Sequence, residues 1–498
     1  MKRKLWPRGG SALLVATLAA AAFAASPPVP AAALAHAAGA ALDVPMAAAG
    51  EPWPHPSEMR FESITFDPVE PARFELSNGI VVYFLENRDL PVVSGRIFLP
   101  LGRLAEAPGQ AGLVDFATWL IASGGAGELS PEETSRELNF MASEVSIAST
   151  TTYTYAQFKS LSRFTGRTLE ITADRIMRPR FSPEHVEGIR GRLIEGIRRQ
   201  YEVPLNRAEL LFTHLLAPDH PIGRPVTESA IRSFSREDAA EFHERYFGPE
   251  GAVIAVTGDI ELATLQSELE RTIGTWRPAE AQRPAPPELK PVQEPKIYHV
   301  QQQTEQSYIV IGYPGVKLGD PERPAIELAN QVLGGSDLDT RLTRALRVRG
   351  LASTTYSRLR GGYLIPGYFF AIAVAPASTT GRVIETMRAE LRRLIDEPIP
   401  PAEIEQGRTS VLSNALFQID TPLDVVTMRA LAELHGLDRD YFEQYVGRLQ
   451  TLTAEDVQAA VKRWLDPDRM ITLVIGDSAA FDRPLSDFGE VEEVEFEI

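Results

Sequence analysis

This sequence of 498 residues contains no cysteine. That absence excludes disulfide bonds, thiolate zinc sites and attachment of a lipid through a cysteine. The eight histidines form no H-x-x-E-H motif, no H-E-x-x-H motif and no close pair. The nucleophile elbow G-x-S-x-G, the Walker phosphate loop and the Rossmann glycine fingerprint are absent as well. The chain therefore lacks the usual sequence motifs of zinc peptidases, serine hydrolases and nucleotide-binding enzymes.

Basic residues are fewer than acidic residues in this sequence. Fifty Lys and Arg residues stand against 67 Asp and Glu residues, which gives a formal net charge of −17. An acidic chain is repelled by nucleic acid and by anionic membrane surfaces, so neither is expected as the main partner. With 44% apolar residues, the chain has a globular composition that can bury sizeable cores.

Long hydrophobic runs are missing except near the N-terminus. There, four basic residues precede an apolar run from Ser11 to Ala24 that closes on an A-x-A site. This pattern predicts a signal peptide over residues 1–24, because the run is shorter than the ~20 residues that a membrane-spanning helix needs. Residues 25–58 are rich in Ala and Pro and are predicted to be disordered. We expect a periplasmic or secreted protein with no membrane span once the signal is removed.

An internal repeat organises the rest of the chain. Residues 234–259 and 452–477 align without a gap at a constant offset of 218. Each copy predicts a capped helix, a proline turn and an apolar strand that ends on Gly-Asp. Seven identical positions in one such unit favour a duplicated domain, and so long a period indicates tandem domains rather than a solenoid.

A proline-rich stretch separates the two copies. Residues 278–295 contain six prolines, a density that prevents regular structure and predicts a linker. The expected domains are 59–277 and 296–482, followed by an acidic tail at 483–498. Apolar alternation and helical periodicity are interspersed in both halves, so the predicted fold class is α+β.

The N-terminal half holds the stretch that bears on function. Residues 112–120 predict a buried helix that is ended by Gly124 and Gly125. Asp115, Thr118 and Trp119 occupy positions i, i+3 and i+4 of this helix, a spacing at which some zinc peptidases carry two metal ligands and a base. A predicted strand and hairpin at 74–83 come before this helix.

These features resemble the pitrilysin/insulinase family of zinc peptidases, whose motif is H-x-x-E-H. The resemblance spans most of residues 61–480, and further landmarks are Glu106, residues 220–225 and the two Gly-Asp strand ends. It implies two homologous tandem sandwich domains of the metallopeptidase-like (LuxS/processing-peptidase) type. It also implies that two such domains pair with a second pair to enclose a chamber.

The motif is degenerate in this chain. By the resemblance, Asp115, Thr118 and Trp119 stand where the family has His, Glu and His, and Glu195 stands at the third-ligand position. An indole has no free lone pair for a metal, and a threonine hydroxyl is no base near neutral pH. Asp115 and Glu195 alone could hold only a hard cation, and weakly. We therefore expect no zinc and no catalytic residues in this chain.

The family also holds substrate backbone with an Arg and a Tyr from its C-terminal domain. Counted from Arg341, the Arg position falls on Arg347. Counted back from Gly350, one residue is missing and the Tyr position falls on Ser353, with Tyr356 three residues later. Arg347 and Tyr356 are therefore the substrate-binding candidates that the resemblance implies, against the alternative of a basic helix face followed by a strand.

Three functions remain open at this stage. The first is an exported homologue that is inactive alone, binds extended peptides by strand addition near 144–155, and completes the chamber of an active zinc peptidase subunit. The second is a metalloendopeptidase with an atypical site built from Asp115 and Glu195. The third is a non-enzymatic scaffold of the cell envelope.

Overall fold

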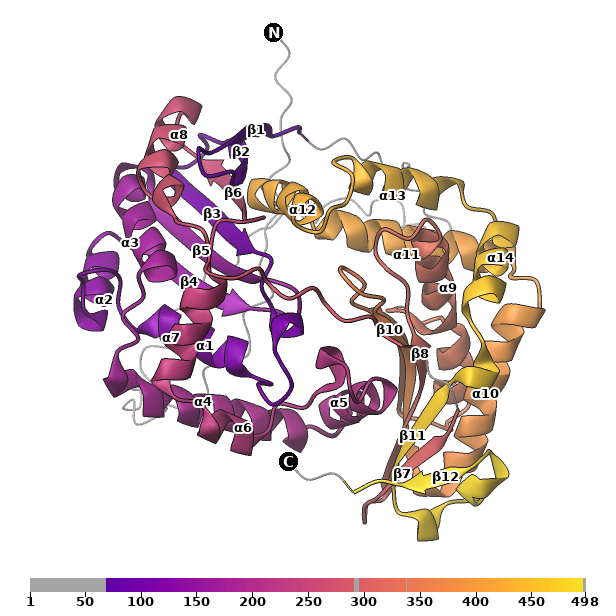
Figure 1. Ribbon diagram of the computed structural model, residues 1–498. Helices are drawn as coiled ribbons and strands as arrows, with labels where there is room; N and C mark the ends of the chain where they lie inside the picture. The colour runs from indigo at the N-terminus through magenta and orange to yellow at the C-terminus, as the bar shows by residue number, and fades with distance from the viewer. Residues whose placement is uncertain (1–68, 291–294, 337, 496–498) are drawn as a thin grey trace, which may run out of the picture. The chain divides into compact units, whose positions relative to one another are not determined.

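Each half of the sequence repeat folds into a sheet of six strands in the computed structural model, which describes residues 69–290, 295–336 and 338–495 (Figure 1). The first sheet has the strand order β1 (Ala72–Glu75), β2 (Val81–Glu86), β6 (Val253–Gly258), β3 (Val92–Leu99), β5 (Thr154–Leu161), β4 (Glu144–Ser149). The second has the order β12 (Val491–Glu493), β7 (Ile297–Gln301), β11 (Ile471–Gly476), β8 (Gln306–Pro314), β10 (Tyr368–Pro376), β9 (Thr354–Arg360). In both sheets the second and third strands in this order run parallel.

Helices follow the same duplication. The first half contains α1 (Leu113–Ser123), α2 (Pro131–Phe140), α3 (Thr165–Met177), α4 (Pro183–Glu202), α5 (Pro204–Leu216), α6 (Glu228–Ser233), α7 (Arg236–Tyr246) and α8 (Leu262–Arg271). The second contains α9 (Arg323–Gly334), α10 (Thr380–Asp396), α11 (Pro401–Phe417), α12 (Pro422–Leu434), α13 (Tyr441–Thr451) and α14 (Ala454–Trp464). The offset of 218 relates α5 to α12, α7 to α14 and β6 to β11 at both ends of each element. Two tandem α/β sandwiches, as the sequence predicted, are therefore confirmed as the fold.

Both faces of each sheet are covered. Every residue of β6 and of β11 is buried, because side chains on alternate faces enter different cores. Ile254 and Val256 face the core under α1, α3 and α7, whereas Val253 and Ala255 pack against α12. Such strands are continuous apolar runs in the sequence rather than alternating ones.

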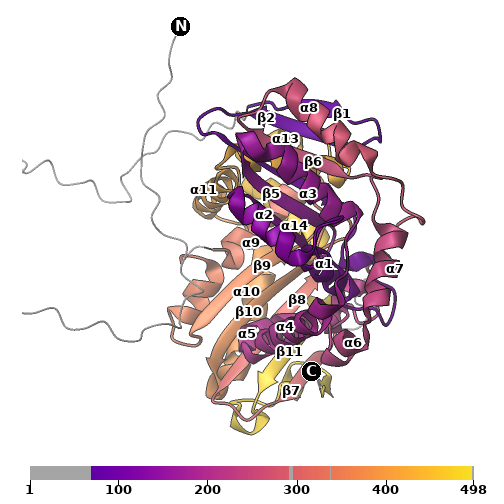
Figure 2. The same ribbon diagram turned by 90° about the vertical axis from the view of Figure 1, so that its left-hand side faces the viewer.

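The two halves exchange one helix each. Helix α12 of the second half packs on β2, β3 and β6 of the first sheet, and α5 of the first half packs on β8 and β11 of the second (Figures 1 and 2). The α5 core gathers Leu211, Phe212 and Leu216 against strand residues that include Val310 and Phe370. Each half thus supplies the cover for one sheet face of the other.

Close packing at this exchange depends on a glycine. Gly312 lies in β8, where a Cβ atom would come within 2.2 Å of the Phe212 Cζ atom. The missing side chain leaves room for the Phe212 ring, which is fully buried and lies 6.0 Å from the Phe370 ring centroid. Aromatic pairs at this separation add to the stability gained from burial alone.

Polar contacts accompany the second exchanged helix. The Glu433 carboxylate on α12 accepts hydrogen bonds from the Tyr83 hydroxyl at 2.6 Å and from Arg73 at 2.9 Å. Arg96 in β3 donates to the Thr427 hydroxyl at 3.1 Å. The side chains that fix α12 on the first sheet therefore come from three of its strands.

The segment expected to be a linker has no helix or strand in its described residues, but it is fixed to the first half. The half-buried Arg283 guanidinium donates to the carbonyls of Tyr246, Gly248 and Glu250, where α7 ends. His220 Nε2 donates to the Pro287 carbonyl at 3.0 Å. These bonds hold the chain against α7 before it enters the second half.

Three local features add to the layout expected from the sequence. The stretch 144–155, named above for strand addition, holds two strands: a turn at 150–153 separates β4 from β5, closed by a hydrogen bond from Thr150 N to Tyr153 O. The basic stretch that contains Arg347 forms a π-helical turn, Thr343–Arg347, because Val348 N bonds to Thr343 O five residues back. The stretch 483–498 is not simply a tail, since β12 pairs with β7.

The predicted signal peptide at 1–24 and the Ala/Pro-rich segment at 25–58 lie outside the described residues. Among the described helices, none combines the length and apolarity that crossing a bilayer requires.

Phe212→Ala tests the helix exchange. The substitution should lower the free energy of unfolding by about 3–5 kcal/mol, because it opens a cavity between α5 and the second sheet. Urea unfolding followed by circular dichroism measures this loss. Leu210→Ala on the same helix is the control: Leu210 is 38% exposed, and its loss should cost under about 1 kcal/mol. Equal, small effects of both substitutions would mean that α5 contributes little to the second sheet.

Candidate functional site

Helix α1 lies where the sequence predicted it, from Leu113 to Ser123. It begins after Gly112, whose φ of 94° is in the left-handed region that favours glycine, and it ends at Gly124. A Cβ atom at Gly112 would also lie 2.7 Å from Val226. One face of α1 is buried in the first core, so the direction of each motif side chain is fixed by the helix.

The three motif positions have different surroundings. Asp115 is half-buried and accepts a hydrogen bond from the Ser149 hydroxyl of β4 at 2.5 Å. Thr118 is fully buried, and its hydroxyl has no hydrogen-bond partner. Trp119 is 43% exposed, and the guanidinium carbon of Arg192 lies 5.5 Å from its ring centroid. Only Asp115 among them carries an atom suited to a cation.

Glu195 lies on α4, on the side away from the buried stripe. Its side chain is 58% exposed and lies 3.9 Å from the Arg199 guanidinium, one turn along the helix. In the described part of the chain, no group of three or more His, Asp or Glu side chains is placed to hold a metal ion. The donor set that a zinc ion needs, three ligands with an open position, does not fit the residues present here.

A buried carboxylate supports the start of α1. Glu106 is 7% exposed, and one of its oxygens accepts hydrogen bonds from Gly112 N at 3.0 Å and from Val114 N at 2.9 Å. Burial raises the pKa of Glu106 from 4.5 to about 7, and the two backbone hydrogen bonds only partly oppose this. Asp115 nearby raises the pKa further. The carboxylate caps a helix whose N-cap residue, Gly112, has no capping side chain of its own.

Comparisons with known proteins agree with this geometry. Residues 233–411 match the family model described as the peptidase M16 inactive domain. The uncharacterized zinc protease YmxG of Bacillus subtilis is 21% identical over 405 residues, which are 81% of this chain and 97% of the relative. The uncharacterized zinc protease SCO5738 of Streptomyces coelicolor is 22% identical over 74% of this chain and 81% of its own length. This chain is pitrilysin/insulinase-like: residues 233–411 match the M16 inactive domain, and relatives named zinc proteases align over most of its length.

Solved M16 structures have the same fold. The M16 inactive domain from Pseudomonas fluorescens superimposes with a TM-score of 0.74 at 20% identity, over 84% of this chain and 100% of that one. The periplasmic protease PqqL from Escherichia coli gives a TM-score of 0.71 at 15% identity, over 84% of this chain and 48% of PqqL. At such low identities the similarity establishes the fold only. The chemistry of this chain has to be inferred from its own residues.

The M16 substrate-binding candidates are not brought together. Arg347 is exposed at the end of the π-helical turn, and its guanidinium has no hydrogen-bond or ion-pair partner among the described residues. Tyr356 is half-buried in β9, with its ring 6.2 Å from that of Phe370 and 4.7 Å from the Arg358 guanidinium. Tyr356 therefore packs against the core beneath α5 rather than against Arg347.

Each sheet of this fold has two edge strands: β1 and β4 in the first sheet, β12 and β9 in the second. None of these four pairs with a further strand in the described part of the chain, and β4 is the edge that lies beside α1. The backbone groups along such an edge are available to an added strand. Strand β4 has the sequence Glu-Val-Ser-Ile-Ala-Ser, and its last residue, Ser149, donates a hydrogen bond to Asp115 of α1.

The structure also contains a cavity of about 530 Å³ beside the turn at 150–153, which the sequence did not predict. Its lining includes Arg103, Arg224, Glu209, Arg360 and Tyr368, drawn from five separate stretches of the chain. Residues that come together from such distant parts of the chain cannot be identified from the periodicity of the sequence. The capping role of Glu106, in contrast, is open to prediction from the sequence, because a helix preceded by glycine needs a capping group from elsewhere.

Glu106 makes stability depend on pH. Its pKa is raised in the folded state, so the folded chain holds a proton that the unfolded chain releases between about pH 4.5 and pH 7. Stability should therefore fall as pH rises through this window, by up to about 3 kcal/mol. Glu106→Gln keeps the acceptor oxygen and removes the titration. The free energy of unfolding of this variant, relative to that of the wild type, should therefore increase between pH 5 and pH 8.

Urea unfolding at both pH values measures that change. Glu195→Gln is the matched control, because it removes an exposed carboxylate and should follow the wild type at both pH values. If the free energies of unfolding of Glu106→Gln and the wild type differed by the same amount at both pH values, the raised pKa assigned to Glu106 would be wrong.

Proposed function

We propose that this chain is a non-catalytic M16 homologue that binds extended peptides and completes the substrate chamber of an active zinc peptidase subunit. The observation that carries the proposal is the state of α1: the helix is intact, but Thr118 is buried in the core and Trp119 presents an indole. A retained scaffold with a changed site suits a binding role. The partner is an M16 chain with an intact H-x-x-E-H motif.

The open edges support peptide binding. An extended peptide that pairs with β4 gains backbone hydrogen bonds along six residues, from Glu144 to Ser149, without depending on its sequence. Trp119 and Arg192 offer exposed aromatic and cationic surface on α1 and α4. Such groups can hold a peptide next to a catalytic centre that the partner supplies.

Export is part of the proposal. The support is the charged and apolar pattern at 1–24, together with the similarity to PqqL, which is described as a periplasmic protease. The proposed location is the periplasm or the outside of the cell.

A second function has some support. The relatives are described as zinc proteases, so a metalloendopeptidase built on Asp115 and Glu195 is the alternative. Against it, each carboxylate already has a partner, Ser149 for Asp115 and Arg199 for Glu195. An envelope scaffold without a peptide partner is the third possibility.

Metal content separates the first two functions. The purified mature chain should carry far less than one zinc ion and should not cleave unfolded peptides, because the motif positions supply neither ligand set nor base. Elemental analysis and a fluorogenic peptide assay measure both. About one zinc per chain, with chelator-sensitive cleavage that Glu195→Gln abolishes, would establish the metalloendopeptidase instead.

Arg347 tests the role in a complex. The chain should co-purify with the active M16 subunit, and Arg347→Ala should raise KM or lower turnover of the complex without loss of assembly. Removal of one charge-assisted hydrogen bond to substrate typically costs about 1–3 kcal/mol, or roughly five- to 150-fold. Arg349→Ala, two residues away and also exposed, should leave the kinetics unchanged. A chain that runs alone, with no effect on the active subunit, would exclude the partnership and favour the scaffold.

A further inference from the structure

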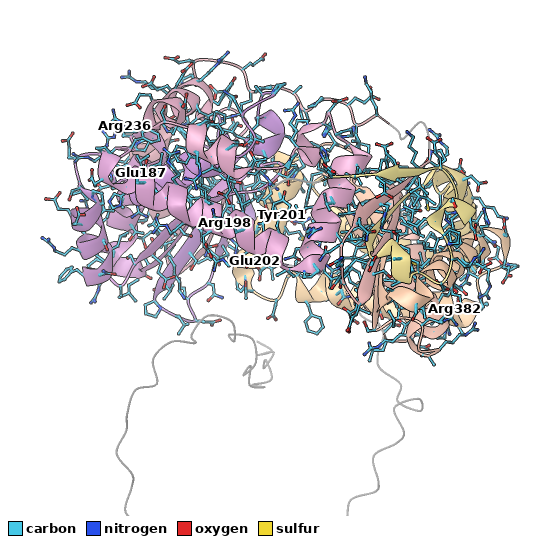
Figure 3. All side chains as sticks on the ribbon, turned by 90° about the horizontal axis from the view of Figure 1, so that it is seen from below. Glu187, Arg198, Tyr201, Glu202, Arg236 and Arg382 are labelled. Carbon is cyan, nitrogen blue, oxygen red and sulfur yellow. The ribbon has the colours of Figure 1, made fainter. Side chains whose placement is uncertain are left out.

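The cavity of about 530 Å³ is lined by the turns that follow the edge strands β4 and β9. Residues 150–153 follow β4, and Gly361 to Tyr363 follow β9, whose last residue is Arg360. One wall comes from the end of α4, where Figure 3 labels Tyr201, and from α5. We call this cavity the junction pocket. A peptide paired with β4 and extended beyond Ser149 reaches its rim.

The junction pocket carries a local excess of positive charge. Its lining contains three guanidinium groups, from Arg103, Arg224 and Arg360, and one carboxylate, from Glu209. The chain as a whole carries a net charge of −17. A local excess of positive charge in a pocket of an acidic protein attracts an anionic group.

The single carboxylate is already neutralised. Glu209 lies 3.3 Å from the Arg360 guanidinium and accepts a hydrogen bond from the Tyr368 hydroxyl at 3.2 Å. Its charge raises the pKa of Tyr368, which burial has already raised, to about 12, so the hydroxyl stays protonated as a donor. Glu209 therefore leaves the other two guanidinium groups without an acidic partner.

Those two groups differ in how firmly they are held. Arg224 donates to the carbonyls of Glu106 at 3.0 Å and Asp219 at 3.2 Å, so it forms part of the wall. Arg103 is exposed, and its guanidinium has neither a hydrogen bond nor an ion pair among the described residues. Its backbone is fixed, since Arg103 N donates to Thr150 O at 3.1 Å in the turn after β4. Arg103 is thus a cation without an ion pair in the described part of the chain, carried by a backbone that is fixed beside the end of β4.

The remaining walls are apolar and aromatic. Leu210 and Tyr363 are each 38% exposed and both line the junction pocket, together with Tyr153 and Ile222. Tyr363 is held by its ring stack on His435, with centroids 4.3 Å apart. A volume of about 530 Å³ falls within the range of sites that enclose small ligands or a few residues of peptide.

We propose that the junction pocket binds the carboxylate of an extended peptide together with an adjacent apolar or aromatic side chain. Arg103 pairs with the carboxylate, and Leu210 and Tyr363 contact the side chain. The carboxylate comes either from the peptide's C-terminus or from an acidic residue near it. This inference rests on the proposed peptide-binding function and adds a preference for ligand chemistry to it.

The test is fluorescence anisotropy with the full mature chain and three labelled ten-residue peptides of alternating valine and threonine. One ends in phenylalanine with a free carboxylate, one is its C-terminal amide, and one is the amide with aspartate before the phenylalanine. The free acid should bind roughly tenfold more tightly than the plain amide, as expected for one charge-assisted contact. Arg103→Gln should abolish that preference, and Arg136→Gln, an exposed arginine of α2 that lines no described pocket, should preserve it.

The aspartate peptide distinguishes the two sources of the carboxylate. Binding equal to that of the free acid means that any carboxylate near the end is accepted, whereas binding equal to that of the plain amide means that the C-terminus itself is read. Equal binding of all three peptides, unaffected by Arg103→Gln, would overturn the junction pocket and leave peptide binding intact. No binding of any peptide would overturn the proposed function and this inference with it. Thermal melting of each variant checks that it folds.

Discussion

The reciprocal packing of α5 and α12 is the constraint on which the rest of the structure depends. Each helix leaves its own half and covers the sheet face of the other. Burial on both faces is what allows β6 and β11 to be apolar throughout. Because α4 leads directly into α5, the same exchange fixes the end of α4 and one wall of the junction pocket.

Features encoded by neighbouring residues could be predicted from the sequence. The capping boxes at Ser235 and Thr453 are confirmed, as are the helix over 112–120 and the equal spacing of the repeated helix and strand. In each, the deciding hydrogen bonds and apolar contacts lie within a few residues or recur with the period of a helix. The fold class followed from these local patterns and from the duplication.

Features that depend on distant residues could not be predicted. Strand β12 joins the sheet because it pairs with β7, and Glu493 also reaches the buried His299 ring at 2.9 Å. The turn at 150–153 depends on η3 (Arg103–Ala105), whose amides donate to Thr150 and Thr151. At the candidate site, the sequence identified Asp115, Thr118, Trp119 and Glu195. It did not predict that Asp115 would contact Ser149, Glu195 would contact Arg199, and Trp119 would contact Arg192.

The helix exchange also has a consequence for the origin of this architecture. A chain equivalent to one half would expose the sheet face that the other half now covers, and its own α5 or α12 would have no sheet to pack on. Two identical copies related by a two-fold axis would satisfy both needs at once, as in a domain-swapped dimer. The linker, which Arg283 fastens to the end of α7, joins such a dimer into one chain. Once joined, the two halves no longer had to remain the same, and each sequence was free to change independently of the other.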